Sequence, residues 1–167
     1  MDTQMDTQMD TQAFKDQMTI LAAFPDQLRK QIAGLDANAL LFRPGPQEWS
    51  ITEVIGHLID IDVLMRARIG KIISTDNPVL QAIDVDATVR ERDYQHKQAT
   101  FLLHSLTEHR AEFIEQIRYI RPQALARLGQ HPTRGPLSAA ELITIVVRHD
   151  ITHTEQIANN LVAFRGQ

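Results

Sequence analysis

The sequence of 167 residues contains no cysteine, which excludes disulfide bonds, thiolate metal sites, iron–sulfur clusters and a cysteine nucleophile. Long apolar runs are also missing. The longest covers residues 142–147, is interrupted by Thr144, and is far too short to cross a bilayer. No basic segment followed by an apolar one opens the chain, so the sequence predicts a cytoplasmic protein with no membrane association.

An excess of positive charge is missing as well. The chain has 17 Lys and Arg against 21 Asp and Glu, which gives a net charge of −4 with neutral histidines. Contacts with phosphates need a clustered cationic surface, so no nucleic-acid partner is expected. The hydrophobic share of 43% and the charged share of 23% are typical of a globular protein, and the length suits one domain with a substantial core.

A short repeat opens the chain, where Met-Asp-Thr-Gln occurs three times in residues 1–12. A repeat of four residues does not match the 3.6 residues of a helical turn, so its methionines do not stay on one face of a helix. The repeat also has too few apolar residues to form a buried face. We expect residues 1–12 to form a low-complexity tail, disordered or frayed, or to extend the first helix, with no function of its own. Residues 13–167 are expected to form the single domain.

Apolar residues recur at helical spacing through most of that domain. Four helices are predicted, at 14–34, from 51 to about 72, at 90–120, and from 138 to about 163. Pro25 predicts a kink or a fresh start within the first helix. Capping boxes, Ser50 with Glu53 and Ser138 with Glu141, mark where the second and fourth helices begin. Such helices bury one another most simply as an all-α four-helix bundle, whose up-down order the sequence leaves open.

Three histidines occupy positions on these helices where apolar residues are expected. His57 lies on the inward stripe of the second helix, and His149 and His153 lie one turn apart on the inward stripe of the fourth. Unsatisfied ring nitrogens in a core cost about 1–3 kcal/mol each. A divalent metal that takes one nitrogen from each ring relieves most of this cost and keeps a coordination position open. The alternative is three ordinary core histidines.

Nearby acidic residues are candidates for holding those rings in place. Glu53 and Asp60 lie about one turn from His57, and Asp150 follows His149 directly. Exposed helical charges are the competing interpretation of all three acids.

The remaining histidines carry weaker signals. His131 lies in a loop rich in Pro and Gly, where it is either a turn residue or part of a pocket at the mouth of the bundle. His96, His104 and His109 fall on different faces of the third predicted helix, so we expect them to be solvated.

Two known metal motifs fit poorly around His149. The segment His-Asp-Ile-Thr-His at 149–153 is similar to the His-Glu-x-x-His of zinc proteases, but Asp150 replaces the glutamate base and no later ligand follows. The His-Asp doublet is also similar to HD-type phosphohydrolases, which need a further aspartate that the chain lacks after Asp150.

The chain as a whole resembles the DinB-like (damage-inducible) metal-binding family over about residues 21–164. The likeness is carried by four segments: Arg-Pro-Gly-Pro-Gln-Glu-Trp-Ser at 43–50, Glu-Val-Ile-Gly-His-Leu at 53–58, Gly-Gln-His-Pro at 129–132 and His-Asp-Ile-Thr-His-Thr-Glu-Gln-Ile at 149–157. The resemblance implies a four-helix bundle, commonly a homodimer, in which His57, His149 and His153 hold a divalent ion. Only the opening repeat departs from the pattern.

The resemblance also implies a class of chemistry. Characterised members of the family that this chain resembles are thiol-dependent transferases or isomerases. In these enzymes the metal binds a low-molecular-weight thiol such as mycothiol or bacillithiol. We therefore expect a metal-dependent enzyme, of the thiol transferase or the hydrolase type, that acts on a small molecule and uses Zn or Ni. The competing hypotheses are a non-catalytic metal-binding or stress-response bundle and a bundle without metal.

Overall fold

A computed structural model describes the backbone of residues 3–166 and the side chains of residues 12–166. The elements within this range are α1 (Thr3–Gln31), α2 (Ala37–Leu41), α3 (Ile51–Ser74), α4 (Val85–Arg92), the 3-10 helix η1 (Tyr94–His96), α5 (Ala99–Ile117), α6 (Pro122–Leu125), β1 (Leu128–His131), β2 (Gly135–Ser138) and α7 (Ala139–Arg165).

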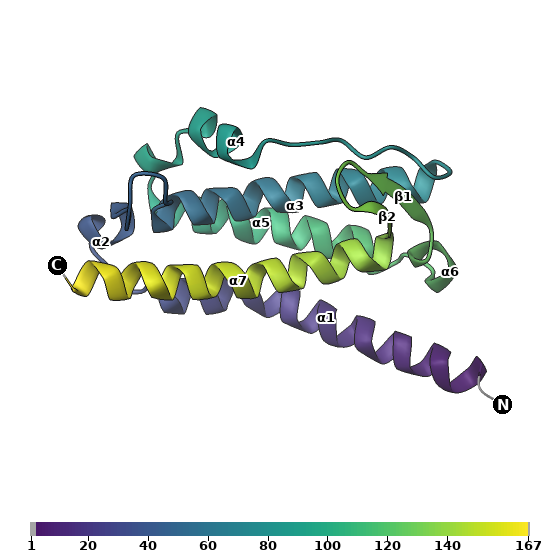
Figure 1. Cartoon of the computed structure of the whole chain (residues 1–167). Helices are drawn as coiled ribbons and strands as arrows, with labels where there is room; N and C mark the ends of the chain where they lie inside the picture. Colours follow the sequence, from purple (N-terminus) through teal and green to yellow (C-terminus); the bar gives the residue numbers. More distant parts are fainter. Residues whose placement is uncertain (1–2, 167) are drawn as a thin grey trace.

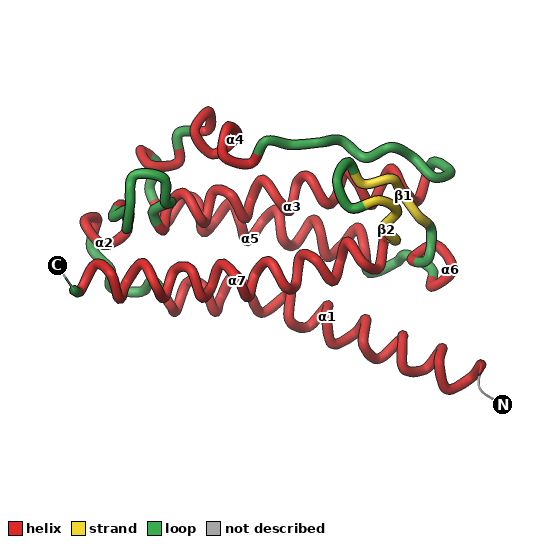
Figure 2. Tube along the Cα trace, viewed as in Figure 1, coloured by secondary structure: helices red, strands yellow, loops and turns green. Residues whose placement is uncertain are grey.

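The four long helices form a four-helix bundle, as predicted (Figure 1). Helix α3 packs against α5 and α7, and α1 closes the bundle from the other side by packing against the same two helices. Helices α1 and α7 run in one direction, and α3 and α5 run in the other (Figure 1). The two parallel helices α3 and α5 are joined by the long connection that carries α4 and η1 (Figure 2).

Local signals set the starts of α3 and α7 where the sequence predicts them. The Ser50 side chain accepts a hydrogen bond from the amide of Glu53, and the Glu53 carboxylate accepts one from the amide of Ser50. Ser138 and Glu141 make the same reciprocal pair before α7. Each pair satisfies amides that the first helical turn leaves without partners. These caps fix the two helices that carry the histidines.

Helix α1 continues through Pro25 as one element, so no fresh helix starts there. Proline has no N–H, and the carbonyl of Leu21, four residues earlier, loses its usual helical partner. Arg110 Nη1 of α5 donates to that carbonyl at 3.3 Å. The bond missing inside α1 is therefore replaced by one from a neighbouring helix.

The opening repeat extends the first helix, because α1 begins at Thr3. This first part of α1 leaves the other helices and projects beyond the end of the bundle (Figure 1). The expected tail lies outside the packed helices, and its residues 1–2 lie outside the described part of the chain.

The predicted helix at 90–120 is wrong in its first third. Helix α4 ends at Arg92, Asp93 adopts a left-handed backbone with φ of 53°, and α5 begins only at Ala99. The cause is a tertiary contact. Tyr94 is buried against Gly56 of α3, so closely that a Cβ on Gly56 would lie 2.2 Å from the ring. Burial of that ring outweighs continuation of the local helical pattern.

The Pro/Gly-rich segment around His131, predicted as a loop at 129–136, forms a small hairpin of β1 and β2 over residues 128–138. Strands β1 and β2 pair antiparallel, with Gly129 opposite Leu137, and Gly135 has a φ of 75° at the turn. The amide of Leu80 donates to the carbonyl of Gln130 at 2.9 Å, which ties the long connection after α3 to β1. The hairpin thus lies beside the connection at the end of α3.

Two apolar clusters fill the bundle, one above the other along its axis. In α3, Leu58 belongs to one cluster and Ile61 to the other; in α7, Ile157 and Val146 are divided in the same way. The residues between them are polar and buried: His57, Asp62, Arg110, Asp150 and His153. The core therefore contains a polar layer, and the candidate site lies in it.

Candidate metal centre

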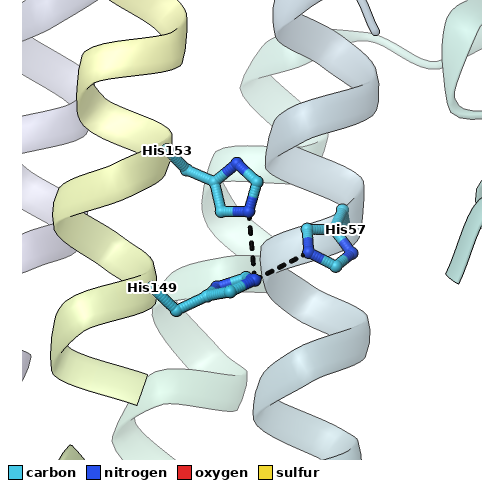
Figure 3. Close-up of side chains that lie close together, drawn as sticks. All are labelled: His57, His149 and His153. Atoms are coloured by element: carbon cyan, nitrogen blue, oxygen red, sulfur yellow. Dashed lines mark hydrogen bonds between the residues drawn. The ribbon is translucent and has the colours of Figure 1, made fainter. Parts of the chain in front are cut away.

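His57 of α3 and His149 and His153 of α7 point toward one another across the groove between these helices (Figure 3). The Nε2 atom of His149 lies 2.9 Å from His57 Nε2 and 3.0 Å from His153 Nε2. The three ligand nitrogens all lie within 4.8 Å of one another. The structure brings together the three histidines that the sequence selected.

Hydrogen bonds alone account poorly for this cluster. A neutral imidazole carries one N–H, so the Nε2 atom of His149 is either a single hydrogen-bond donor or a single acceptor. It therefore cannot form good hydrogen bonds to His57 Nε2 and His153 Nε2 at the same time. Two nitrogens that are about 2.1 Å from one ion and about 90° apart lie about 3.0 Å from each other. The two distances from His149 Nε2 to its neighbours fit nitrogens that share a divalent ion.

The environment keeps all three rings neutral, which is the form that binds a metal. Burial, the largest cause, acts together with the nearby His149 and His153 to lower the pKa of His57 to about 2. Burial also lowers the pKa of His149 to about 3, with help from His153 and Arg110. Burial lowers the pKa of His153, and the hydrogen bond to Gln156 partly offsets this by raising the pKa. No proton competes for these nitrogens at neutral pH.

Two residues that sequence reasoning missed hold the rings in place. His153 Nδ1 lies 2.7 Å from Gln156 Oε1, so Nδ1 carries the proton and Nε2 presents its lone pair. The Trp49 ring lies 4.8 Å from the His57 ring and is stacked 6.2 Å from the His153 ring. The i, i+3 spacing of His153 and Gln156 was a usable signal, whereas the Trp49 contact depends on the tertiary fold.

The three acidic candidates have other partners. Glu53 binds the guanidinium of Arg43, with Nε at 2.8 Å, and takes part in the cap with Ser50. Asp60 accepts a hydrogen bond from Tyr94 and lies 3.7 Å from Arg92. In the described residues none of them is hydrogen-bonded to a ring of the cluster, and His149 Nδ1 is buried without a partner.

Asp150 belongs to a buried charge network beneath the cluster. Arg110 of α5 donates to both oxygens of Asp150, at 2.6 and 2.9 Å, and its Nε donates to Asp62 of α3 at 2.9 Å. Burial raises the pKa of Asp150 to about 6 despite the lowering effect of Arg110. The network joins the three helices α3, α5 and α7 directly next to His149.

A cavity of about 410 Å³ opens onto the three histidines. Its walls are mostly apolar and come from α3, α7 and the segments 82–85 and 131–134, and Trp49 and His131 also line it. His131 therefore lies in the predicted pocket. No Asp or Glu is among the described residues that line this cavity. The three imidazoles that would hold an ion therefore border a space that a small molecule could enter.

The other histidines take no part in the cluster. His96 and His104 are exposed and lie beside Asp93 and Glu108, and His109 lies 3.6 Å from Glu112. In residues 3–166 no helix combines the length and the apolar character that a membrane span requires.

The fold and the site together define a class: four-helix bundles with a three-histidine cluster that faces a cavity. The chain belongs to the DinB superfamily, whose sequence model matches residues 20–157. Its fold is similar to that of YfiT from Bacillus subtilis, described as a probable metal-dependent hydrolase with an unusual four-helix bundle topology, at a TM-score of 0.81 and 18% identity over 87% of this chain and 84% of that one. A comparison with curated protein sequences gives no match.

Proposed function

We propose that this protein is a metal-dependent enzyme that binds a divalent ion through His57, His149 and His153 and acts on a small molecule in the adjoining cavity. One observation carries the proposal. Three neutral Nε2 atoms converge at 2.9 and 3.0 Å on the wall of a cavity whose described lining includes no carboxylate. A structural zinc site is closed by a fourth protein ligand, whereas three imidazoles beside a cavity have the composition of a catalytic site.

A divalent ion in such a site lowers the pKa of a coordinated water or thiol, which supplies a nucleophile at neutral pH. The residues of this chain have other tasks. Gln156 holds the proton of His153 on Nδ1, and Trp49 packs against two of the rings.

Hydrolysis of an amide or ester is the first candidate reaction. The similarity to YfiT, described as a probable metal-dependent hydrolase, supports it. Transfer of a low-molecular-weight thiol is the second candidate. The chain has no cysteine, so such a thiol has to arrive as a cosubstrate, and a cavity of about 410 Å³ is large enough for an organic ligand.

Metal analysis tests the first half of the proposal. Protein purified without a histidine tag and loaded with Zn²⁺ or Ni²⁺, the two ions that we propose, is expected to hold about one ion per chain. His149→Ala is expected to hold none after the same loading. A wild-type content near zero would leave three core histidines and remove the metal proposal.

Activity assays test the second half. Ester, amide and thiol-transfer panels are run on the loaded wild type and on His149→Ala, with His104→Ala as a control on an exposed histidine outside the cluster. Activity that is present in the wild type and the control and absent in His149→Ala supports an enzyme. Bound metal with equal, background turnover in all three proteins favours a non-catalytic metal-binding bundle instead.

The homodimer that the family resemblance implies is also a proposal. Measurement of the molecular mass in solution tests it against 19.0 kDa for one chain.

A further inference from the structure

A second group in the same cavity has no role in metal binding. Arg68 of α3 is buried, with 6% of its surface exposed, and lines the cavity. Its Nη2 donates to the carbonyl of Gln81 at 2.6 Å, and its Nη1 donates to His131 Nε2 at 3.2 Å. Its Nε is buried and has no partner in the described part of the chain.

The charge of Arg68 is not balanced within the described residues. Arg110, which is more deeply buried, has two carboxylates, whereas no carboxylate of residues 12–166 forms an ion pair with Arg68. Arg134, at the turn of the hairpin, lines the same cavity and adds a second positive charge, and burial together with Arg134 lowers the pKa of Arg68. A buried cation without an anion is unfavourable, so this end of the cavity is built to receive negative charge.

The position of Arg68 relative to the histidines defines the shape of a ligand. Arg68 is eleven residues after His57 on α3, a rise of about 16 Å along the helix. Between them the cavity is lined by apolar side chains, Ile61 and Met65 of α3 and Ile145 of α7. The cavity therefore has a metal-binding end, an apolar middle and a cationic end.

We propose that Arg68, assisted by Arg134, binds an anionic group of the substrate, a carboxylate or a phosphate, while the reacting group lies at the histidine cluster. The substrate class is then a small organic anion with an apolar segment between its two polar ends. This inference rests on the proposed function for the reacting end, but the anion site is formed by residues that bind no metal. Guanidinium groups suit it, since they pair with both carboxylates and phosphates through two parallel hydrogen bonds.

Calorimetric titration with two probes of equal chain length, hexanoate and hexyl phosphate, tests the anion site. The protein is kept in a chelator, so that metal plays no part. We expect at least one probe to bind the wild type and to bind Arg68→Met at least tenfold more weakly. Arg134→Met is expected to weaken binding by a smaller factor. Arg118→Met, which removes an exposed arginine paired with Glu115 outside the cavity, is the charge-matched control and is expected to bind as the wild type does.

The two probes distinguish the sources of negative charge: stronger binding of hexyl phosphate assigns a phosphate, and stronger binding of hexanoate assigns a carboxylate. No binding of either probe, or equal binding by the wild type and Arg68→Met, overturns the inference. If Arg68→Met fails to fold by circular dichroism, the exposed Arg134 decides, and undiminished binding by Arg134→Met overturns it. Metal content measured on the same proteins after loading without chelator keeps the two proposals apart, because a wild type that holds about one ion per chain but binds neither probe refutes only this one.

Discussion

Gln156 Oε1 accepts a hydrogen bond from His153 Nδ1 over 2.7 Å, one helical turn away on α7. This bond selects the ring tautomer whose Nε2 faces His149. Removal of such a supporting partner typically lowers metal affinity about 10–100-fold. We therefore expect Gln156→Leu to weaken Zn²⁺ binding by about that factor, measured by competition with a chromophoric chelator.

Gln156→Glu is the matched variant, because a carboxylate accepts the same hydrogen bond. It is expected to keep the affinity within a few-fold of the wild type. Equal weakening by both substitutions would show that Gln156 acts by packing and not through its oxygen.

Trp49 is the single tryptophan of the chain and lies against His57 and His153, so it reports directly on the cluster. We expect Ni²⁺ to quench the tryptophan fluorescence in a saturable way, with a stoichiometry of about one ion per chain. His149→Ala is expected to shift the midpoint to at least 100-fold higher Ni²⁺, because a lost ligand costs more than a lost supporting bond. Unchanged fluorescence on addition of Ni²⁺, with metal binding shown independently, would contradict the position of Trp49.

The metal-free protein is expected to lose stability as the pH falls from 7 to 5. In the unfolded chain His57 and His149 take up protons near pH 6.5, whereas the folded chain keeps them neutral until pH values of about 2 and about 3. The unfolded state then binds more protons, so each ring lowers the free energy of unfolding by about 1.4 kcal/mol per pH unit below 6.5. Urea unfolding in a chelator at several pH values measures this slope.

His57→Leu removes one of these titrating groups, so its slope is expected to be flatter than that of the wild type. Asp150 acts in the opposite direction, since its pKa is raised to about 6, but it is present in both proteins and cancels in the comparison. Identical slopes would mean that His57 is protonated in the folded state.

Arg110 pairs with two buried carboxylates, Asp62 and Asp150, and also donates to the carbonyl of Leu21. Its replacement by Met leaves uncompensated charge in the core, a change that typically costs about 3–5 kcal/mol. We expect Arg110→Met to lower the free energy of unfolding by about this amount in urea denaturation. The triple variant with Asp62→Asn and Asp150→Asn is expected to recover much of the loss, and no recovery would argue against a charge effect.

The parts of this fold that could be predicted from sequence are those set by local signals. Ser50 and Ser138 begin their helices through contacts within four residues, and the three histidines were recognisable because they interrupt apolar stripes. The break at residues 93–98 depends on Tyr94 packing on Gly56, which no local pattern reveals. The hairpin was missed because its glycines and prolines indicate a turn and its strands are only four residues long.

The partners of the site residues were harder to predict than the site itself. The sequence placed Asp150 next to His149, but its carboxylate is bound by Arg110 of α5, forty residues away in the chain. Gln156, a neutral side chain, supports the ring of His153 instead. Arg68 is an ordinary helical cation in the sequence, and only the tertiary structure shows it buried, with no carboxylate paired to it among residues 12–166.

The main-chain bonds between Leu80 and Gln130, and between Gln130 and Pro78, couple two stretches of chain that border the cavity. Because one stretch leads to Ile83 and the other to His131, an outward movement of one rim alone would break these bonds. Widening of the entrance that keeps these bonds intact is therefore a concerted displacement of both rims.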